Sequence, residues 1–258
     1  MTQVGRRGRP TRIRIGRDGR VTTLAPGEFV TPRFIARRGS RVRVCLVGHQ
    51  AMLLAGDNLD IEIEVDDGAQ LELVESAATV AYNGRGGRAT WNARARVTGF
   101  SSLIWRSEPF VVAAGADVER SIQLAVEDGG VAAVYESLVL GRHREPGGAI
   151  RSDTRATVSG RPVLVERLDL RDSAARSRPG VLGESRVLAS ALAVGLPICS
   201  TVTPYATPLP GPGGLARVLG SNAHQAEEQL RSIWESWRDS LRCYRRSPEG
   251  VVEGAMTH

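Results

Sequence analysis

The chain of 258 residues is poor in the side chains that most often cross-link proteins or hold metals. It has three cysteines, Cys45, Cys199 and Cys243, which lie far apart and include no CxxC pair. An odd number of isolated cysteines argues against a disulfide framework and against a structural zinc site. Only four histidines occur, and none lies in an HxH or HExxH arrangement. The few isolated cysteines favour a reducing compartment, so we expect a cytoplasmic protein.

Motifs for nucleophilic and nucleotide chemistry are also missing. No GxSxG is present, which removes the nucleophile elbow of many hydrolases. The glycine-rich segment 83–87 is followed by neither a lysine nor a helical pattern, so it does not match a P-loop or a dinucleotide cradle. We therefore expect a protein that is not an enzyme and that binds no cofactor tightly.

Long hydrophobic runs are absent too. The longest apolar run, 187–198, has twelve residues, whereas a helix that crosses a bilayer needs about 20. The arginine-rich N-terminus has no apolar segment typical of a signal peptide. We expect no association with a membrane.

Lysine does not occur, and all 34 basic residues are arginine. Twelve of them lie within residues 1–43, where Asp18 and Glu28 are the only acids, while the rest of the chain has a small acidic excess. We expect residues 1–20 to form a flexible basic arm. Its segment 7–10, Arg-Gly-Arg-Pro, resembles the core of an AT-hook, which lies in the minor groove of DNA. A DNA-associated β-protein that uses this arm is an alternative function, but one short match favours a solvated tail over a nucleic-acid partner.

Alternation of apolar and polar residues runs through much of the chain. It is clearest in 59–65 and 88–97 and recurs in 121–126, and such a period of two is typical of strands with one buried face. Seven glycines from Gly68 to Gly160 are spaced by 13 to 17 residues, as expected for stacked strand-and-turn units. We predict a mainly β fold of stacked strands resembling a β-helix or solenoid. A meander of hairpins is the alternative.

The C-terminal part has a different pattern. The segment 201–214 is rich in proline and glycine and predicts a loop, and Ser221 is a candidate N-cap after it. Apolar residues then recur every three or four positions. This spacing predicts one long amphipathic α-helix over about 221–245.

The apolar stripe of this helix has two interpretations. It includes Trp234 and Trp237, half of the tryptophans in the chain. In one interpretation the stripe packs on the sheet as core. In the other, the two tryptophans dock a partner protein together with Arg238 and Arg242, because tryptophan and arginine are frequent interface anchors.

One predicted strand carries a row of carboxylates on a single face, about 7 Å apart: Asp60, Glu62, Glu64 and Asp66. Like charges in a row repel one another unless something neutralises them. Arg94 and Arg96 of a neighbouring strand are the internal candidates. A basic partner surface or passing divalent cations are the functional ones.

Several segments, taken in order, carry a family resemblance: Gly56-Asp57-Asn58-Leu59, Gly68-Ala69-Gln70-Leu71-Glu72-Leu73, Ala77-Ala78-Thr79-Val80-Ala81-Tyr82, Glu108-Pro109-Phe110, Gly115-Ala116 and Glu136-Ser137-Leu138-Val139-Leu140-Gly141-Arg142. They resemble the urease accessory protein family UreD, called UreH in some species. The tryptophan-bearing helix at the end of the chain also resembles that family. The resemblance covers roughly residues 30–245 and is strongest at 135–142.

The resemblance implies a single β-rich domain over 21–258 that ends in helices and has no catalytic activity. It implies binding to the urease apoprotein and to UreF-like and UreG-like accessory proteins. It also implies a role in inserting nickel into the urease active site.

An internal nickel channel is a further implication of the resemblance. Its candidate lining residues are Asp57, Asp60 and Glu136, with Glu75 behind them. Oxygen ligands would let Ni²⁺ exchange quickly, so the metal would be bound only transiently. A structural pair between Glu136 and Arg142 is the alternative role for Glu136.

Overall fold

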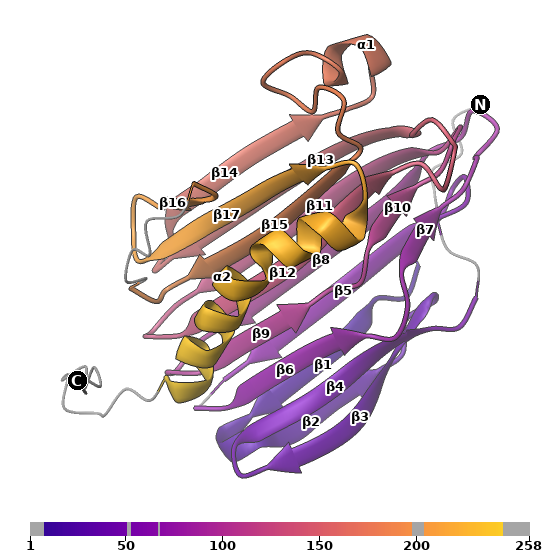
Figure 1. Cartoon of the computed structure of the whole chain (residues 1–258). Coiled ribbons are helices and arrows are strands. Elements are labelled where there is room, and N and C mark those ends of the chain that lie inside the picture. The colour runs from indigo at the N-terminus through magenta and orange to yellow at the C-terminus, as the bar shows by residue number, and fades with distance from the viewer. Residues whose placement is uncertain (1–7, 51–52, 67, 198–203, 245–258) are drawn as a thin grey trace.

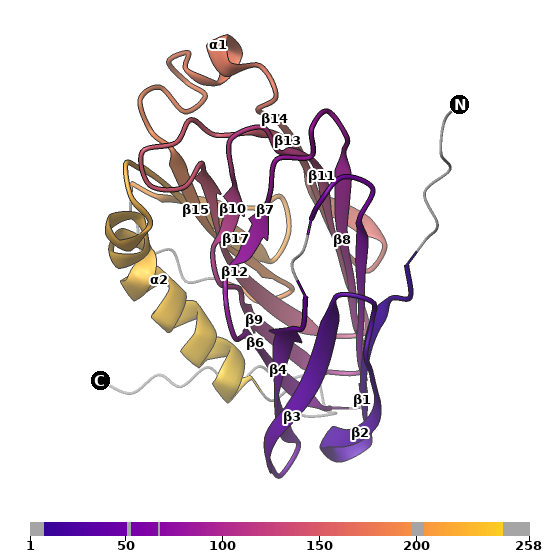
Figure 2. The same ribbon diagram turned by 90° about the vertical axis from the view of Figure 1, so that its right-hand side faces the viewer.

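The computed structural model describes residues 8–50, 53–66, 68–197 and 204–244. Its strands form two sheets that face each other across an apolar interior, with a long helix on the outer face of one sheet (Figures 1 and 2). The seven-stranded sheet contains, in spatial order, β14 (Arg161–Asp169), β13 (Ala149–Val158), β11 (Asp117–Val126), β8 (Ala89–Val97), β5 (Asn58–Val65), β1 (Thr11–Gly16) and β2 (Arg20–Ala25). A short 3₁₀ turn, η1 (Arg17–Gly19), joins the last two strands.

The second sheet has ten strands. Its main path is β16 (Ala206–Pro208), β17 (Gly213–Gly220), β15 (Val187–Val194), β12 (Val131–Leu140), β9 (Ser102–Arg106), β6 (Gln70–Glu75), β4 (Arg41–Gly48) and β3 (Val30–Arg38). Two short strands, β7 (Thr79–Ala81) and β10 (Phe110–Val112), pair with each other, and β10 also pairs with β12. The four-residue helix α1 (Ser173–Arg176) lies between β14 and β15 in the chain and is capped by Asp172.

The middle of the chain winds as a solenoid, which we call the coil, and each turn passes from one sheet to the other and back. Parallel neighbours in the seven-stranded sheet are separated by one full turn of the coil, 32 residues from Ile61 to Ala93 and 29 from Ala93 to Ile122. The glycine interval found in the sequence is about half of this, because each turn crosses two main sheets. Gly68 and Gly99 occupy such crossings with positive φ, where a side chain would strain the backbone. The predicted β-solenoid is confirmed, and hairpins occur at the two ends of the coil.

Alternation in the strands explains where the core lies. Leu59, Ile61, Ile63 and Val65 of β5 point into the space between the sheets and are almost fully buried. The charged residues between them face outward. The same pattern in the other strands builds one apolar core between the sheets.

The helix α2 (Ala223–Cys243) forms a second core against the outer face of the ten-stranded sheet (Figure 2). Its span agrees with the predicted helix, but its N-cap is Asn222 and not Ser221. The Asn222 side chain accepts a hydrogen bond of 3.0 Å from the backbone N–H of Gln225. The helix is too polar to cross a bilayer, and no helix among the described residues is long and apolar enough to do so.

The predicted flexible arm over residues 1–20 is wrong for its second half. Residues 1–7 lie outside the described part of the chain, but strand β1 already begins at Thr11 and pairs in parallel with β5. Ile13 and Ile15 are 0% and 1% exposed. The physical reason is again alternation, because the arginines between these isoleucines point outward while the isoleucines fill the core.

This correction predicts that Ile13→Ala lowers the free energy of unfolding by about 2–5 kcal/mol, the cost of truncating a buried isoleucine. Ile35→Ala, at a position that is 47% exposed, is the matched control and should cost much less. Chemical denaturation of both variants measures the difference. Equal stability of the two variants would mean that β1 is not part of the core.

Candidate functional site

The interior between the sheets is mostly apolar, but it holds a cluster of charged residues. Arg120 of β11 and Glu136 of β12 project toward each other from opposite sheets and form an ion pair. The side chain of Arg120 is 7% exposed, and its Nη1 donates a hydrogen bond of 3.2 Å to Ser152 Oγ. We call Glu75, Arg120 and Glu136 the interior cluster. A charge held this far from water needs a partner, and Glu136 supplies it.

Aromatic rings help to hold the buried guanidinium. The Arg120 guanidinium carbon lies 4.8 Å from the ring centre of Trp91 and 5.4 Å from that of Phe110. The two rings themselves meet edge to face at 6.0 Å. The negative faces of aromatic rings attract a cation, so this setting partly replaces the water that Arg120 loses on folding.

Glu75, at the end of β6, completes the interior cluster. Its carboxylate accepts hydrogen bonds of 3.2 Å from the Trp105 indole N–H and from the backbone N–H of Glu108. Burial raises the pKa of Glu75 to about 7, and these hydrogen bonds and the charge of Arg120 only partly oppose the rise. The group therefore changes its charge near neutral pH.

The three side chains of the interior cluster line one small pocket. Its volume is about 20 Å³, enough for roughly one water molecule. A second pocket of about 10 Å³ is also lined by Glu136, together with Ser190 and Arg217. Arg217 of β17 pairs with Glu166 of β14, where the two sheets end. Polar groups thus run through the interior from β6 to the β14–β17 end.

The structure brings together only two of the four predicted channel residues. Glu75 and Glu136 share a pocket, but Asp57 lies in the loop before β5 and accepts a hydrogen bond of 2.8 Å from the Leu54 N–H. Asp60 lies on the outer face of the seven-stranded sheet, 3.2 Å from Asn92 Nδ2. The prediction that these two aspartates line the same interior path is wrong for this structure, because alternation turns Asp60 away from the interior.

The alternative pairing of Glu136 with Arg142 is also wrong. Arg142 pairs with Glu145 at 2.6 Å on the surface, while Glu136 pairs with Arg120. Sequence reasoning missed Arg120, although a signal was present. Arg120 occupies an inward position of an alternating strand, between Val118 and Ile122.

Three of the four carboxylates in the row form ion pairs within the chain, and the fourth, Asp66, accepts a hydrogen bond from the Thr98 hydroxyl. Arg12 and Arg14 of β1 contact Glu62 and Glu64 at 2.7 and 2.8 Å. Arg94 lies 3.9 Å from Asp60, as predicted, whereas the second predicted partner, Arg96, pairs with Glu127. In the described part of the chain, no group of three or more metal-ligating side chains is present.

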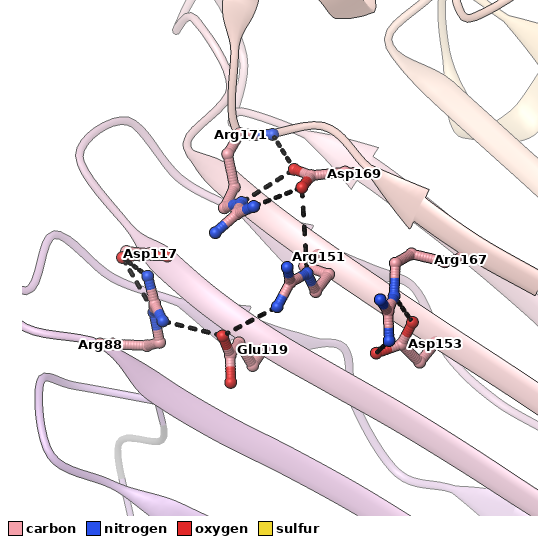
Figure 3. A network of polar contacts seen from close by, with 8 residues as sticks. All are labelled: Arg88, Asp117, Glu119, Arg151, Asp153, Arg167, Asp169 and Arg171. Carbon is pink, nitrogen blue, oxygen red and sulfur yellow. Dashed lines mark hydrogen bonds and ion pairs between the residues drawn. The ribbon is translucent and has the colours of Figure 1, made fainter.

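A second network of charges covers the outer face of the seven-stranded sheet near its α1 end (Figure 3). Arg88 contacts Glu119 at 2.8 Å, and Arg151 reaches the same carboxylate at 3.6 Å. Arg171 pairs with Asp169 and lowers the pKa of that carboxyl to about 2. These groups pair with one another on a face that is partly open to solvent, so the network is a structural surface.

A groove of about 420 Å³ runs between α2 and the ten-stranded sheet. Charged side chains of both signs line it: Arg43, Glu72, Arg106, Glu227, Arg231, Glu235, Arg238 and Arg242. We call it the α2 groove. Arg242 contacts Glu72 at 2.9 Å and so ties the end of the helix to β6.

The predicted partner anchors separate into two groups. Trp234 and Trp237 are each 4% exposed and pack against the sheet, so their role as core is the one that the structure shows. The Trp234 ring lies 5.5 Å from that of Tyr135. Arg238 and Arg242 line the α2 groove and remain accessible there.

The raised pKa of Glu75 predicts a pH-dependent effect of Glu75→Gln. A carboxyl whose pKa is higher in the folded chain stabilises the fold fully below its ordinary pKa of 4.5, and this contribution is lost as the pH rises through 7. The glutamine variant does not undergo this loss. Between pH 5 and pH 8, its free energy of unfolding should therefore rise by on the order of 1–3 kcal/mol relative to that of the parent chain.

Thermal and urea unfolding at pH 5, 6, 7 and 8 measures this gain. Glu228→Gln, at an exposed position of α2, controls for the general removal of a carboxylate. A difference between Glu75→Gln and the parent that does not change with pH would show that the carboxyl has no raised pKa.

Comparison with known proteins identifies a family for this chain. A family model described as UreD urease accessory protein matches residues 11–249. The chain is 42% identical to urease accessory protein UreD 1 of Streptomyces griseus over 89% of its own length and 91% of that protein. It is 33% identical to UreD of Parafrankia sp., with 84% and 83% covered, and 31% identical to UreD 2 of Saccharopolyspora erythraea, with 74% and 73% covered. The chain belongs to the UreD family of urease accessory proteins.

Proposed function

We propose that the protein is a non-catalytic scaffold for urease maturation in the cytoplasm. In this role it binds the urease apoprotein together with UreF-like and UreG-like accessory proteins and assists the insertion of nickel. Membership in the UreD family supports a role in urease maturation. The observation that carries the nickel part of the proposal is the meeting of Glu75 and Glu136 in one interior pocket.

The interior cluster has the chemistry that a passing cation needs. Carboxylate oxygens bind divalent metals weakly enough for exchange when histidine and cysteine are absent. Because the pKa of Glu75 lies near 7, binding of Ni²⁺ would displace a proton that is held part of the time at neutral pH. The metal is cargo in this proposal and is not a resident cofactor.

Passage of the cation requires movement of side chains. A pocket of about 20 Å³ holds roughly one water and not a hydrated metal ion. Arg120 occupies the position beside Glu136 that the cation would take. Arg120 must therefore move away from Glu136 when Ni²⁺ arrives, and its return would help to expel the ion.

The α2 groove supports the docking part of the proposal. Its arginines and glutamates alternate along the helix, so it fits a partner segment with charges of both signs. Trp234 forms part of its apolar floor. We propose that the UreF-like partner docks here, with Arg231 and Arg238 as its main contacts.

The interior proposal predicts that Glu75→Gln lowers urease activation by about ten-fold or more, a loss typical of disturbed metal contacts. Glu75→Gln keeps the Arg120–Glu136 pair, whereas Glu136→Gln would leave a buried guanidinium unpaired and destabilise the fold. Urease activity and nickel content, measured in a host that lacks its own copy of this gene, provide the readout.

Asp57→Asn and Asp60→Asn serve as matched controls for that experiment, because both remove a carboxylate outside the interior. They should activate urease as the parent chain does. Normal activation by a folded Glu75→Gln variant that still binds its partners would refute the interior path.

The docking proposal predicts that Arg231→Glu combined with Arg238→Glu weakens binding of the purified UreF-like partner by about ten-fold or more. Arg144→Glu combined with Arg161→Glu removes two exposed arginines that do not line the α2 groove and should bind normally. Isothermal titration of both double variants tests the assignment. Unchanged affinity of the groove variant would place the partner elsewhere.

A further inference from the structure

Strand β3 contains six consecutive exposed residues, Arg33 to Arg38. A strand in a two-layer β fold normally buries every second side chain. Here Phe34 is 52% exposed and its neighbour Ile35 is 47% exposed. We call this six-residue segment the β3 patch.

A β-bulge explains why two adjacent large apolar side chains are both exposed. The register between β3 and β4 shifts between Phe34 and Ala36, so Ile35 has no opposite residue in β4. Phe34 lies opposite Val44, which is fully buried, but no strand among the described residues pairs with the other edge of β3. Strand β3, which carries Phe34, therefore forms one margin of the ten-stranded sheet (Figure 1).

The charged residues of the β3 patch all have one sign: Arg33, Arg37 and Arg38. Arg37 donates hydrogen bonds to the backbone oxygens of Asp18 and Gly39, not to a carboxylate.

The arginines near the start of the described chain differ in pairing from those on the outer face of the seven-stranded sheet. Ten arginines lie between residues 8 and 43, and only Arg12 and Arg14 among them form ion pairs with carboxylates of the described residues. On the outer face of the seven-stranded sheet, by contrast, arginines and acids pair in networks (Figure 3). The three arginines of the β3 patch thus form no ion pair with a carboxylate of the described residues, and the acid next to them, Asp18, contacts Arg37 through its backbone oxygen.

We propose that the β3 patch is a docking surface for a protein that presents an acidic rim around an apolar centre. An apolar core with a charged margin is the usual anatomy of a protein interface. Charged residues and bulges also protect strand edges against aggregation, but that purpose is not served by two large exposed apolar side chains. Phe34 is the one aromatic residue of the β3 patch, so successive bases would find no second ring to stack on, which favours a protein over a nucleic acid.

This surface is separate from the α2 groove and from the interior cluster. A maturation scaffold has to hold more than one protein, so the β3 patch would supply a second attachment point. The inference rests on the proposed function only for the identity of the partner. The surface itself is argued from exposure and charge.

Site-specific photocrosslinking in the native host tests the proposal. A benzophenone amino acid replaces Phe34 in the full-length chain, and in a matched control it replaces Val165, an apolar residue that is 68% exposed on the edge strand β14. We expect position 34 to capture one protein at least about ten-fold more efficiently than position 165. Mass spectrometry should place the crosslink in a segment rich in aspartate and glutamate.

Charge reversal provides the second measurement. Arg33→Glu with Arg38→Glu should reduce the crosslink at position 34, and the affinity of the purified captured partner, by about ten-fold. The double variant of Arg144→Glu and Arg161→Glu should leave both unchanged. Circular dichroism verifies that each variant is folded.

Several results would overturn the inference: no protein captured at position 34 above the control, a captured segment without acidic residues, capture of nucleic acid, or binding that resists charge reversal. Capture of an acidic protein unrelated to urease would support the docking surface while removing support from the maturation role. Capture of the urease apoprotein or an accessory protein would support both.

Discussion

Two facing sheets must fill one shared interior, and this constraint determines the rest of the structure. Each strand sends alternate side chains inward, and nearly all of them are Val, Leu, Ile or Ala. Arg120 breaks this apolar layer, and a buried guanidinium requires a carboxylate and polarisable surfaces around it. Glu136 and the rings of Trp91 and Phe110 meet that requirement. Glu136 is thus matched to the arginine held at that point, whereas Glu75 is held by the Trp105 indole N–H and the Glu108 backbone N–H.

The sequence predicted which segments form strands better than it predicted which strands lie side by side. Alternation identified β5 and β8, and the glycine interval indicated one crossing of the coil. The position of β1 was missed because the arginines in its Thr-Arg-Ile-Arg-Ile segment resemble a solvated arm. Once β1 lies beside β5, those arginines face the acidic row and neutralise it. The local alternation of residues shows that a segment forms a strand. Which distant strands pair with each other depends on charges and packing contacts that form only in the folded chain.

The residues predicted to line the nickel channel show the same difference between local pattern and long-range contact. Asp60 could have been assigned to the outer face from sequence, because Leu59 and Ile61 on either side of it are apolar. The meeting of Glu75 with Glu136 could not, since it depends on a coil with turns of 29 to 32 residues and on the register between β6, β9 and β12. The tryptophans of α2 illustrate a third limit. An amphipathic stripe has the same pattern whether it covers its own sheet or a partner.

The ten-stranded sheet links the inside of the molecule to its surface. In β12, Tyr135 points to the α2 groove and packs against Trp234, while the next residue, Glu136, points into the interior and holds Arg120. In β6, Glu72 faces the groove and contacts Arg242, while Glu75 lies in the interior pocket. A protein docked in the groove and an ion inside the coil would thus contact opposite faces of the same two strands. Adjacent residues of β12 thus serve the two sides of the sheet: Tyr135 is buried under α2 and packs against Trp234, and Glu136 holds Arg120 in the interior.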